Sequence, residues 1–320
     1  MERIEPTAVQ QVAIIGAGVI GAGWTAHFLR QGLDVVVYDS APNAEASLRT
    51  KIAEVWPILE NLGLKKGASP ERWCFAGSVA EAVAEAHFVQ ENAPERLATK
   101  QTVLAEIDAS APPETVISSS TSGYAMTDLQ VKCRHHPERT VVGHPLNPPY
   151  LIPLVEVVGG VKTDPAVVDW TADFWTAVGK KPLKMTKELP GFIANRLQEA
   201  MWREALHMIH NGMATIKEID AAITTGPGLR WAIMGPMLTF HLAGGAQGMT
   251  HMLDHFNPNE FDDWTFLTAP QITDELNSRI VAGCEAETDS RSIRQLEQER
   301  DTSLVALLQA LSRCREEDDV

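Results

Sequence analysis

The stretch VAIIGAGVIGAG, residues 12–23, decides the fold of this chain. Its first part is a continuous apolar run, as expected of a strand buried on both faces of a sheet. Gly16, Gly18 and Gly21 follow at the spacing of a loop that leads from a strand into a helix. Gly16 permits a tight turn, Gly18 lets a pyrophosphate approach the main chain, and Gly21 lets the helix pack on the strand. The stretch therefore predicts a dinucleotide-binding unit, because a helix N-terminus offers N–H groups and a positive dipole end to phosphates.

The carboxylate of Asp39 indicates which dinucleotide is bound. Asp39 ends a second apolar run, VVVYD (35–39), and follows Gly21 by eighteen residues. A carboxylate at this position accepts hydrogen bonds from ribose hydroxyls and repels a 2′-phosphate, and the following Ser40 and Ala41 supply no arginine. The sequence predicts NAD as the cofactor. A role of Asp39 as a cap of the turn is the alternative.

Short β-branched runs alternate with helical stretches up to residue 187. The further runs are HFVQE (87–91), TVISS (115–119), TVVGH (140–144), LVEVV (154–158) and KKPLKMT (180–186). Strands separated by helices favour parallel pairing through right-handed crossovers. We therefore expect an α/β fold, with a Rossmann-type doubly wound sheet over residues 1–187. A long helix is expected over residues 44–62, closed by Gly63.

The pattern becomes helical from residue 188 onward. Residues 192–213 and 292–314 carry apolar side chains at about the 3.6-residue helical period. We expect a smaller all-helical domain over residues 188–320 that serves substrate binding and dimerisation. Several apolar helix faces in one domain permit a symmetric partner to complete the core.

The charge balance excludes several classes of partner. The chain has 27 Lys and Arg against 42 Asp and Glu, a formal net charge of -15. Such a surface repels the phosphates of nucleic acids and anionic lipids. No apolar run is long enough to span a bilayer, the opening MERIEPTAVQ lacks a signal-peptide pattern, and the four cysteines show no CxxC spacing. We expect a cytoplasmic protein with reduced thiols and no nucleic-acid or membrane partner.

His144 and Glu156 are the candidates for acid–base chemistry. His144 ends an apolar run, and strand ends in an open α/β sheet face the ligand crevice. Glu156 lies inside the apolar run LVEVV, where a lone carboxylate is costly and needs a partner such as an imidazole N–H. A bound dinucleotide suggests hydride transfer, and oxidation of an alcohol needs a base for its proton. Glu156 would then fix the tautomer of His144 and stabilise the imidazolium. A core histidine without a catalytic role is the alternative for His144 taken alone.

A metal site is not expected. His251 and His255 have the i, i+4 spacing of a helical metal pair, but Met252 stands where a zincin motif needs glutamate. No third ligand follows at a fixed spacing.

Five blocks of sequence resemble the L-3-hydroxyacyl-CoA dehydrogenase superfamily, in the same order and across both predicted domains. They are GAGVIGAG (16–23), SSSTSG (118–123), HPLNPP (144–149), LVEVV (154–158) and PGFIANRL (190–197). The resemblance implies that His144 is the general base and that Glu156 orients it. It also implies a homodimer formed through the helical domain.

The same resemblance assigns three further residues. Ser122 would hydrogen-bond the substrate hydroxyl and the catalytic histidine. Asn195 would polarise the same oxygen from the second domain. Glu91 would contact the cofactor near its nicotinamide ribose.

Two segments depart from the acyl-CoA members of the superfamily. They are HPLNPPYLIPLVE (144–156) and GPGLRWAIMGP (226–236). Basic residues for a CoA tail are also sparse around the helix expected at residues 44–62, which carries Arg49 and Lys51 and is followed by Lys65 and Lys66. Both segments resemble a short-substrate branch, which comprises the L-carnitine dehydrogenases and the L-gulonate dehydrogenases of the λ-crystallin type. Residues 202–220, 243–249 and 292–301 resemble the carnitine members more closely.

The branch implies an oxidoreductase of carnitine metabolism that oxidises the 3-hydroxyl of L-carnitine to 3-dehydrocarnitine with NAD. Arg230 is the candidate for the substrate carboxylate, because a guanidinium binds a carboxylate bidentately. Tyr150 and Trp231 are candidates for the quaternary ammonium, which aromatic faces hold, and Trp202 and Phe240 are further ones. L-gulonate, a 3-hydroxyacyl-CoA, and a crystallin-like NAD-binding protein without turnover stay open as alternatives.

Overall fold

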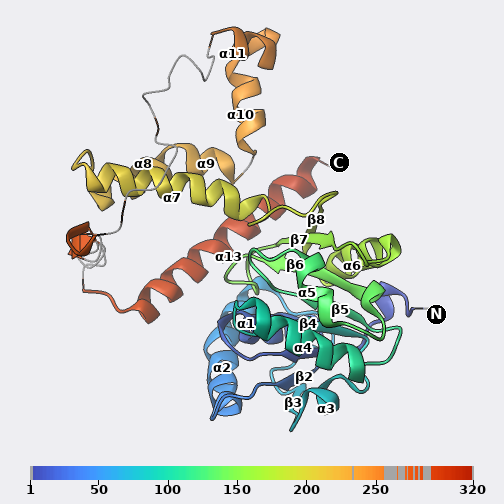
Figure 1. Cartoon of the computed structure of the whole chain (residues 1–320). Coiled ribbons are helices and arrows are strands. Elements are labelled where there is room, and N and C mark those ends of the chain that lie inside the picture. The colour runs from blue at the N-terminus through green and yellow to red at the C-terminus, as the bar shows by residue number, and fades with distance from the viewer. Residues whose placement is uncertain are drawn as a thin grey trace. The chain divides into compact units, whose positions relative to one another are not determined.

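The computed structural model describes residues 3–232, 234–255, 265, 271, 273–276, 278–279, 282–283 and 290–318. Contacts between residues divide the chain into two units, Met1–Asn195 and Arg196–Val320. The first unit carries the sheet, and the described part of the second is helical (Figure 1).

The first unit is built on one eight-stranded sheet. Its strands are β1 (Gln11–Ile15), β2 (Asp34–Tyr38), β3 (Trp73–Phe75), β4 (Phe88–Glu91), β5 (Val116–Ser119), β6 (Thr140–Pro145), β7 (Leu154–Gly159) and β8 (Lys181–Lys184). They lie in the order β3-β2-β1-β4-β5-β6-β7-β8. The order changes direction between β1 and β4, and in open α/β sheets ligands bind at such a point, beyond the carboxyl ends of the strands.

The predicted strand runs are confirmed, and one strand was missed. β3 has only three residues, which are half-buried or exposed and lie at the edge of the sheet. So short and exposed a strand leaves no apolar run in the sequence.

The expectation of parallel pairing is wrong at one place. β6 and β7 pair antiparallel, whereas the other neighbouring strands in the described sheet are parallel. Residues 146–153 connect them without a helix, and a parallel crossover needs a dozen or more residues. The antiparallel register puts His144 directly opposite Glu156.

Helices cover both faces of the sheet, which confirms the doubly wound arrangement. One face is covered by α1 (Val19–Arg30), α2 (Ala44–Leu62) and α6 (Pro165–Ala177), the other by α3 (Val79–Val83), α4 (Leu97–Ser110) and α5 (Met126–Leu129). Short 3-10 turns lie at Pro6–Ala8, Gln130–Lys132 and Pro137–Arg139. Val12 and Ile14 pack into the first layer, Ala13 and Ile15 into the second, as the alternation of a strand requires. The predicted end of α2 is confirmed by Gly63, whose φ of 94° favours glycine.

A buried ion pair ties the end of α4 to the start of β6. Arg139 is fully buried and lies 3.4 Å from the carboxylate of Asp108, and it also donates to the carbonyls of Asp108, Ala111 and Pro112. The Asp108 carboxylate accepts the N–H groups of His135 and His136 as well, each at 2.9 Å. The pair therefore fixes the position at which β6, the strand that carries His144, begins.

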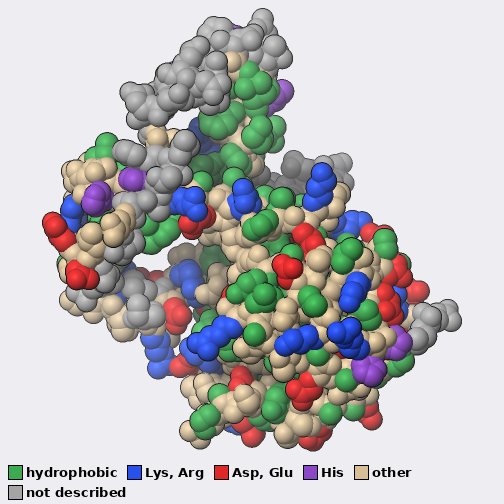
Figure 2. Space-filling model, in the orientation of Figure 1, with side chains coloured by type: hydrophobic (Ala, Val, Ile, Leu, Met, Phe, Trp, Pro, Cys, Tyr) green, Lys and Arg blue, Asp and Glu red, His purple; other side chains and the backbone are tan. Residues whose placement is uncertain are grey.

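The described part of the second unit consists of helices, as predicted. They are α7 (Ala194–His210, which begins in the first unit), α8 (Ile216–Thr225), α9 (Pro227–Trp231), α10 (Pro236–Ala243), α11 (Met249–His255) and α13 (Ile293–Asp318), with a 3-10 turn at Gly245–Gln247. Large apolar side chains are exposed on α10, where Figure 2 shows them gathered: Met237, Leu238, Phe240 and Leu242.

Two findings bear on the expectations from composition. Among the described residues, no helix has the length and apolarity needed to cross a membrane. Cys74 and Cys133 are free thiols, while Cys284 and the side chain of Cys314 lie outside the described residues.

Candidate active site

His144 and Glu156 form a buried hydrogen-bonded pair across the β6–β7 ladder. Nδ1 of His144 lies 2.8 Å from Oε2 of Glu156, and both side chains are buried. The pairing follows from the register, because directly opposed residues of antiparallel strands project from the same face of the sheet. The sequence-based inference that Glu156 needs an imidazole partner is met in the structure.

The start of α7 holds the second oxygen of Glu156. Oε1 accepts the N–H groups of Ile193 at 2.9 Å and of Ala194 at 3.0 Å. These are main-chain donors at a helix N-terminus, which favours negative charge. Burial acts to raise the pKa of Glu156, but the hydrogen bonds from His144, Ala194 and Ile193 outweigh it and hold the pKa below the usual value. The carboxylate is therefore ionised at neutral pH.

The lowered pKa of Glu156 predicts a pH dependence of stability. A carboxylate with a depressed pKa contributes stability that is present above its usual pKa and is lost as the pH falls through the folded-state pKa. We expect the free energy of unfolding to fall more steeply in acid for the wild type than for Glu156→Gln, as measured by urea unfolding at several pH values below about 6. Exposed Glu85, replaced in Glu85→Gln, is the control, and equal slopes for all three proteins would contradict the prediction.

A strained turn seats the aromatic ring that packs against the histidine. Phe192 adopts a φ of 50°, in the left-handed region that a bulky residue rarely occupies, directly after Gly191 at 73°. Its buried ring lies 5.0 Å from the His144 ring, centroid to centroid. Such strain persists only where the surrounding structure enforces it, and it is common at functional sites.

The surroundings of His144 fix its tautomer. An ionised Glu156 can only accept, so Nδ1 of His144 must carry the proton. Nε2 then has a lone pair, and the Asn195 amide nitrogen, a donor, lies 3.5 Å from it. The same amide donates to the main-chain carbonyl of Ser122 at 2.9 Å. Nε2 is thus arranged to accept a proton beside the Asn195 amide, which is itself bonded to the Ser122 carbonyl. Asn195 is the last residue of the first unit.

Two residues that the sequence analysis did not name hold Ser122 in place. Glu95 accepts the Ser122 N–H at 2.9 Å and the Thr121 hydroxyl at 2.7 Å, both on Oε1. The other oxygen of Glu95 lies 3.3 Å from the ammonium of Lys100, which is almost fully buried. Because Ser122 itself is exposed, its position depends on these main-chain contacts.

Glu91 is the last residue of β4 and lies in the interior of the protein. It is fully buried, and its carboxylate accepts from Lys100 at 3.0 and 3.2 Å, from the Ser119 hydroxyl at 2.5 Å and from Ala93 N–H at 2.6 Å. These contacts join β4, β5 and α4. The cofactor contact expected of Glu91 stays a prediction, and Glu95, whose side chain is 41% exposed, is the accessible carboxylate at this edge.

The glycine loop has the geometry that a pyrophosphate requires. Gly16 has a φ of 97°, and a Cβ there would lie 2.6 Å from the Asn92 carbonyl oxygen. A Cβ on Gly21 would overlap the Gly16 carbonyl, whereas one on Gly18 would meet no atom within 4 Å. Gly18 therefore borders open space at the N-terminus of α1, and the residues present fit NAD.

Asp39 braces this loop from the end of β2. Its Oδ2 accepts the Ala17 N–H and its Oδ1 the Ala41 N–H, each at 2.7 Å. The second contact is the turn cap that was considered as an alternative. A carboxylate offers about four acceptor positions, so two main-chain bonds leave capacity for ribose hydroxyls.

The residues predicted for the substrate fall in both units. Tyr150 is half-buried in the first unit and packs against the core next to α1. Arg230 and Trp231 lie on α9 in the second unit, where Arg230 is exposed and Trp231 is 37% exposed. A substrate role for these three residues stays a prediction.

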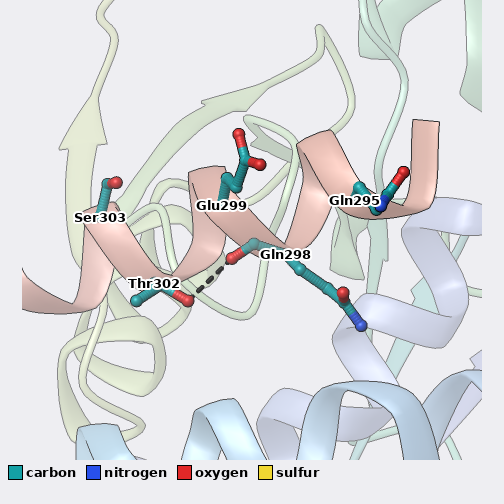
Figure 3. A pocket seen from close by; sticks show the side chains of 5 residues that line it. All are labelled: Gln295, Gln298, Glu299, Thr302 and Ser303. Atoms are coloured by element: carbon teal, nitrogen blue, oxygen red, sulfur yellow. Dashed lines mark hydrogen bonds between the residues drawn. The ribbon is translucent and has the colours of Figure 1, made fainter. Parts of the chain in front are cut away.

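No residue of the predicted site lies in the pocket drawn in Figure 3. Gln295, Gln298, Glu299, Thr302 and Ser303 of α13 line it, and the Thr302 hydroxyl donates to the Gln298 carbonyl. That bond is internal to the helix. Among the described residues, no group of three or more His, Cys, Asp or Glu side chains could hold a metal ion.

Comparison with known proteins covers both units. Residues 11–189 match the family model "3-hydroxyacyl-CoA dehydrogenase, NAD binding domain", and residues 191–275 match its C-terminal domain. An L-carnitine dehydrogenase of Streptomyces griseus is 58% identical over 96% of this chain and 92% of its own. One of Streptomyces coelicolor is 55% identical over 98% of both chains.

A solved structure extends the likeness to the fold. The NAD+ dependent dismutase 5-formyl-3-hydroxy-2-methylpyridine 4-carboxylic acid 5-dehydrogenase superposes with a TM-score of 0.80 at 29% identity, over 95% of this chain and 99% of that one. The expected resemblance is thereby confirmed at the level of sequence and of fold. The chain belongs to the 3-hydroxyacyl-CoA dehydrogenase family, and residues 11–189 form its NAD-binding domain.

Proposed function

We propose that the protein oxidises the 3-hydroxyl of L-carnitine to 3-dehydrocarnitine, with NAD as the oxidant. The observation that carries the substrate is the 58% identity, over 96% of the chain, to a relative named L-carnitine dehydrogenase. The chemistry is supported by the buried His144–Glu156 pair with Asn195 beside it.

His144 acts as the general base in this proposal. Its Nε2 takes the proton of the 3-hydroxyl, since Nδ1–H is committed to Glu156. The imidazolium that forms lies 2.8 Å from an ionised carboxylate, which offsets the cost of a buried positive charge. Glu156 keeps its own charge through the step, because two main-chain N–H groups hold its other oxygen.

Ser122 and Asn195 hold the reacting oxygen. The Asn195 amide donates to the main-chain carbonyl of Ser122 at 2.9 Å, which ties the two residues together at the site. In this proposal the Asn195 amide donates to the oxygen of the substrate's 3-hydroxyl. The hydroxyl proton then points toward Nε2 of His144, and the C3–H bond of the substrate points away from Nε2.

Gly16, Gly18, Gly21 and Asp39 would hold NAD, with Glu91 as the predicted neighbour of the nicotinamide ribose. When bound, NAD supplies the acceptor for the hydride that leaves C3 of the substrate. The open space at Gly18 and the carboxylate of Asp39 at the end of β2 support this assignment.

Gly18→Ala is expected to weaken NAD binding without disturbing the fold. Gly18 has a φ of −63°, which alanine adopts freely, and the added methyl would occupy the space that the pyrophosphate needs. We expect Kd for NAD to rise by about tenfold or more and Tm to stay unchanged, measured by fluorescence titration and thermal unfolding. Unchanged affinity would mean that the pyrophosphate does not approach the main chain at Gly18.

Gly21→Ala is the matched variant. Its Cβ would overlap the Gly16 carbonyl, so this change should lower Tm itself.

Three residues are proposed for the substrate. Arg230 would bind the carboxylate, and Trp231 and Tyr150 would pack against the trimethylammonium group. A cation–π contact contributes about 0.5–2 kcal/mol, and an ammonium without N–H groups needs such faces.

The domain limits and the assembly also remain proposals. We place the NAD-binding domain at residues 1–187 and the substrate and dimerisation domain at 188–320, and we propose a homodimer in the cytoplasm. The exposed apolar side chains of α10 support a symmetric partner for the helical unit (Figure 2).

Initial rates of NADH formation test the proposed function. The protein is supplied with NAD and, separately, with L-carnitine, L-gulonate and a 3-hydroxybutyryl-CoA. We expect turnover with L-carnitine alone. Turnover with the sugar acid or the CoA ester instead would move the protein to another branch of its family. NAD binding without turnover of any of the three would favour a protein that has kept the fold and lost the reaction.

A further inference from the structure

Residues 146–153 join the strand that carries His144 to the strand that carries Glu156. The segment contains Pro148, Pro149 and Pro153, which have no main-chain N–H. The N–H groups of Leu151 and Ile152 both donate to the Pro148 carbonyl, at 3.1 and 3.0 Å. The carbonyls of Pro149 and Ile152 must therefore find donors outside the segment.

Lys180 supplies these donors. Its ammonium donates to the Ile152 carbonyl at 3.1 Å and to the Pro149 carbonyl. The side chain is only 3% exposed and its Nζ lies 5.1 Å from the ring centroid of Trp24 in α1. A buried ammonium that bonds two carbonyls three residues apart constrains the path of the chain between them.

Helix α1 packs against the same segment at Gly23. A Cβ at Gly23 would lie 2.6 Å from Cγ of Pro149 and 3.4 Å from Cδ1 of Tyr150. The segment thus packs directly on the helix that begins at the glycine loop. Lys180 therefore bonds the same segment that follows β6 and packs on α1.

We propose that Lys180 is a positioning residue of this enzyme, whose ammonium holds residues 147–152 against α1 and so fixes the wall of the substrate site beside His144. That wall carries exposed Asn147 and half-buried Tyr150. The inference rests on the proposed function for the identity of the substrate that meets the wall. The contact of Lys180 with the Pro149 and Ile152 carbonyls does not depend on the proposed function.

Among the residues that the structure describes, no carboxylate forms an ion pair with this ammonium. The charged group of α1 that acts on it is Arg30, and burial together with the charge of Arg30 lowers the pKa of Lys180 to about 7. Burial also lowers the pKa of His27 well below its usual value, so that ring is neutral. As the pH rises through about 7, Lys180 loses its proton, and a neutral amine donates more weakly than an ammonium.

Amide hydrogen exchange tests the contact without reference to turnover. The variant is Lys180→Met, which keeps the length of the side chain, and the control is Lys181→Met at its exposed neighbour. We expect exchange at Leu151 and Ile152 to accelerate by about tenfold or more in Lys180→Met, while the β6–β7 ladder amides and the control stay unchanged. Unchanged exchange at both amides would overturn the proposal, whatever the activity.

Kinetics then test the role in the site. In Lys180→Met we expect KM for L-carnitine to rise by about tenfold or more, with kcat less affected and Kd for NAD unchanged. In the wild type KM should rise as the pH passes through about 7, and this rise should be absent from the variant. Proportionate loss of kcat, NAD affinity and Tm would show a merely structural lysine and overturn the proposal.

Lys180→Gln decides the matter if the methionine variant does not fold. The amide keeps N–H donors for the carbonyls but carries no charge at any pH. A KM that no longer depends on pH near 7 would support the proposal, and a wild-type pH dependence would overturn it. If Lys180→Met shows the exchange effect but the wild type does not oxidise L-carnitine, the proposed function fails and the positioning role stands.

Discussion

Replacement of His144 by glutamine is expected to lower kcat for L-carnitine oxidation by about 10²–10⁴-fold, the usual contribution of a positioned general base. An amide cannot take up the hydroxyl proton. It can still donate to Glu156, so the buried carboxylate keeps a partner and the fold should be retained. The measurement is the initial rate of NADH formation with saturating NAD, together with Kd for NAD and Tm, which should both stay at wild-type values.

His136→Gln is the matched control for this prediction. His136 is a partly exposed histidine of the same unit that lies before β6 and is bonded to Glu138 at 3.1 Å. It should leave kcat unchanged. Turnover of His144→Gln within a few fold of the wild type would contradict the assignment of the base, and a parallel loss of NAD affinity would make the variant uninformative about proton transfer.

Arg139→Met is expected to destabilise the protein by about 3–5 kcal/mol, the typical cost of breaking a buried ion pair by removing one partner. The change leaves the Asp108 carboxylate buried without its cation. It also removes the guanidinium donor from the carbonyls of Ala111 and Pro112, of which Pro112 keeps the Thr115 N–H. Urea unfolding measures the loss. Exposed Arg134, replaced in Arg134→Met, is the control and should change the free energy of unfolding by less than about 0.5 kcal/mol.

The double variant Arg139→Met/Asp108→Leu sharpens this test. It removes both charges, so it should be more stable than Arg139→Met alone if the cost is that of a stranded carboxylate. It also removes the cap on His135 and His136, so it should not reach the wild type. A double variant less stable than the single one would show that packing around the guanidinium, rather than charge, dominates.

Much of the sheet and of the reacting centre could be predicted from the sequence. The apolar runs that became β1, β4 and β6 are buried on both faces, and that burial leaves a strong local signal. The pairing of His144 with Glu156 followed from the cost of a lone carboxylate in an apolar run, which is a local argument too. The loop glycines followed from their spacing.

The residues that were missed act through contacts distant in sequence. Lys180 bonds carbonyls 28 and 31 positions earlier, and Glu95 bonds the Ser122 N–H 27 positions later. Lysine and glutamate are usually solvated, so nothing in their neighbours marks these two as partners of buried groups. The antiparallel direction of β7 was missed because the direction of a strand depends on the connection before it. The proline-rich segment 146–153 was interpreted only as the end of a strand.

The antiparallel ladder also bears on how this family can change substrate. Five residue pairs of β6 and β7 fix the register of the proposed base and its carboxylate, so changes at the exposed or half-buried connecting residues can alter the surface without altering that register. The chemistry and the recognition surface are thus separate modules on one hairpin. A library confined to residues 146, 147, 150 and 152, with Pro149, Leu151 and Lys180 retained, should yield altered preference among hydroxy acids while the His144–Glu156 pair stays intact.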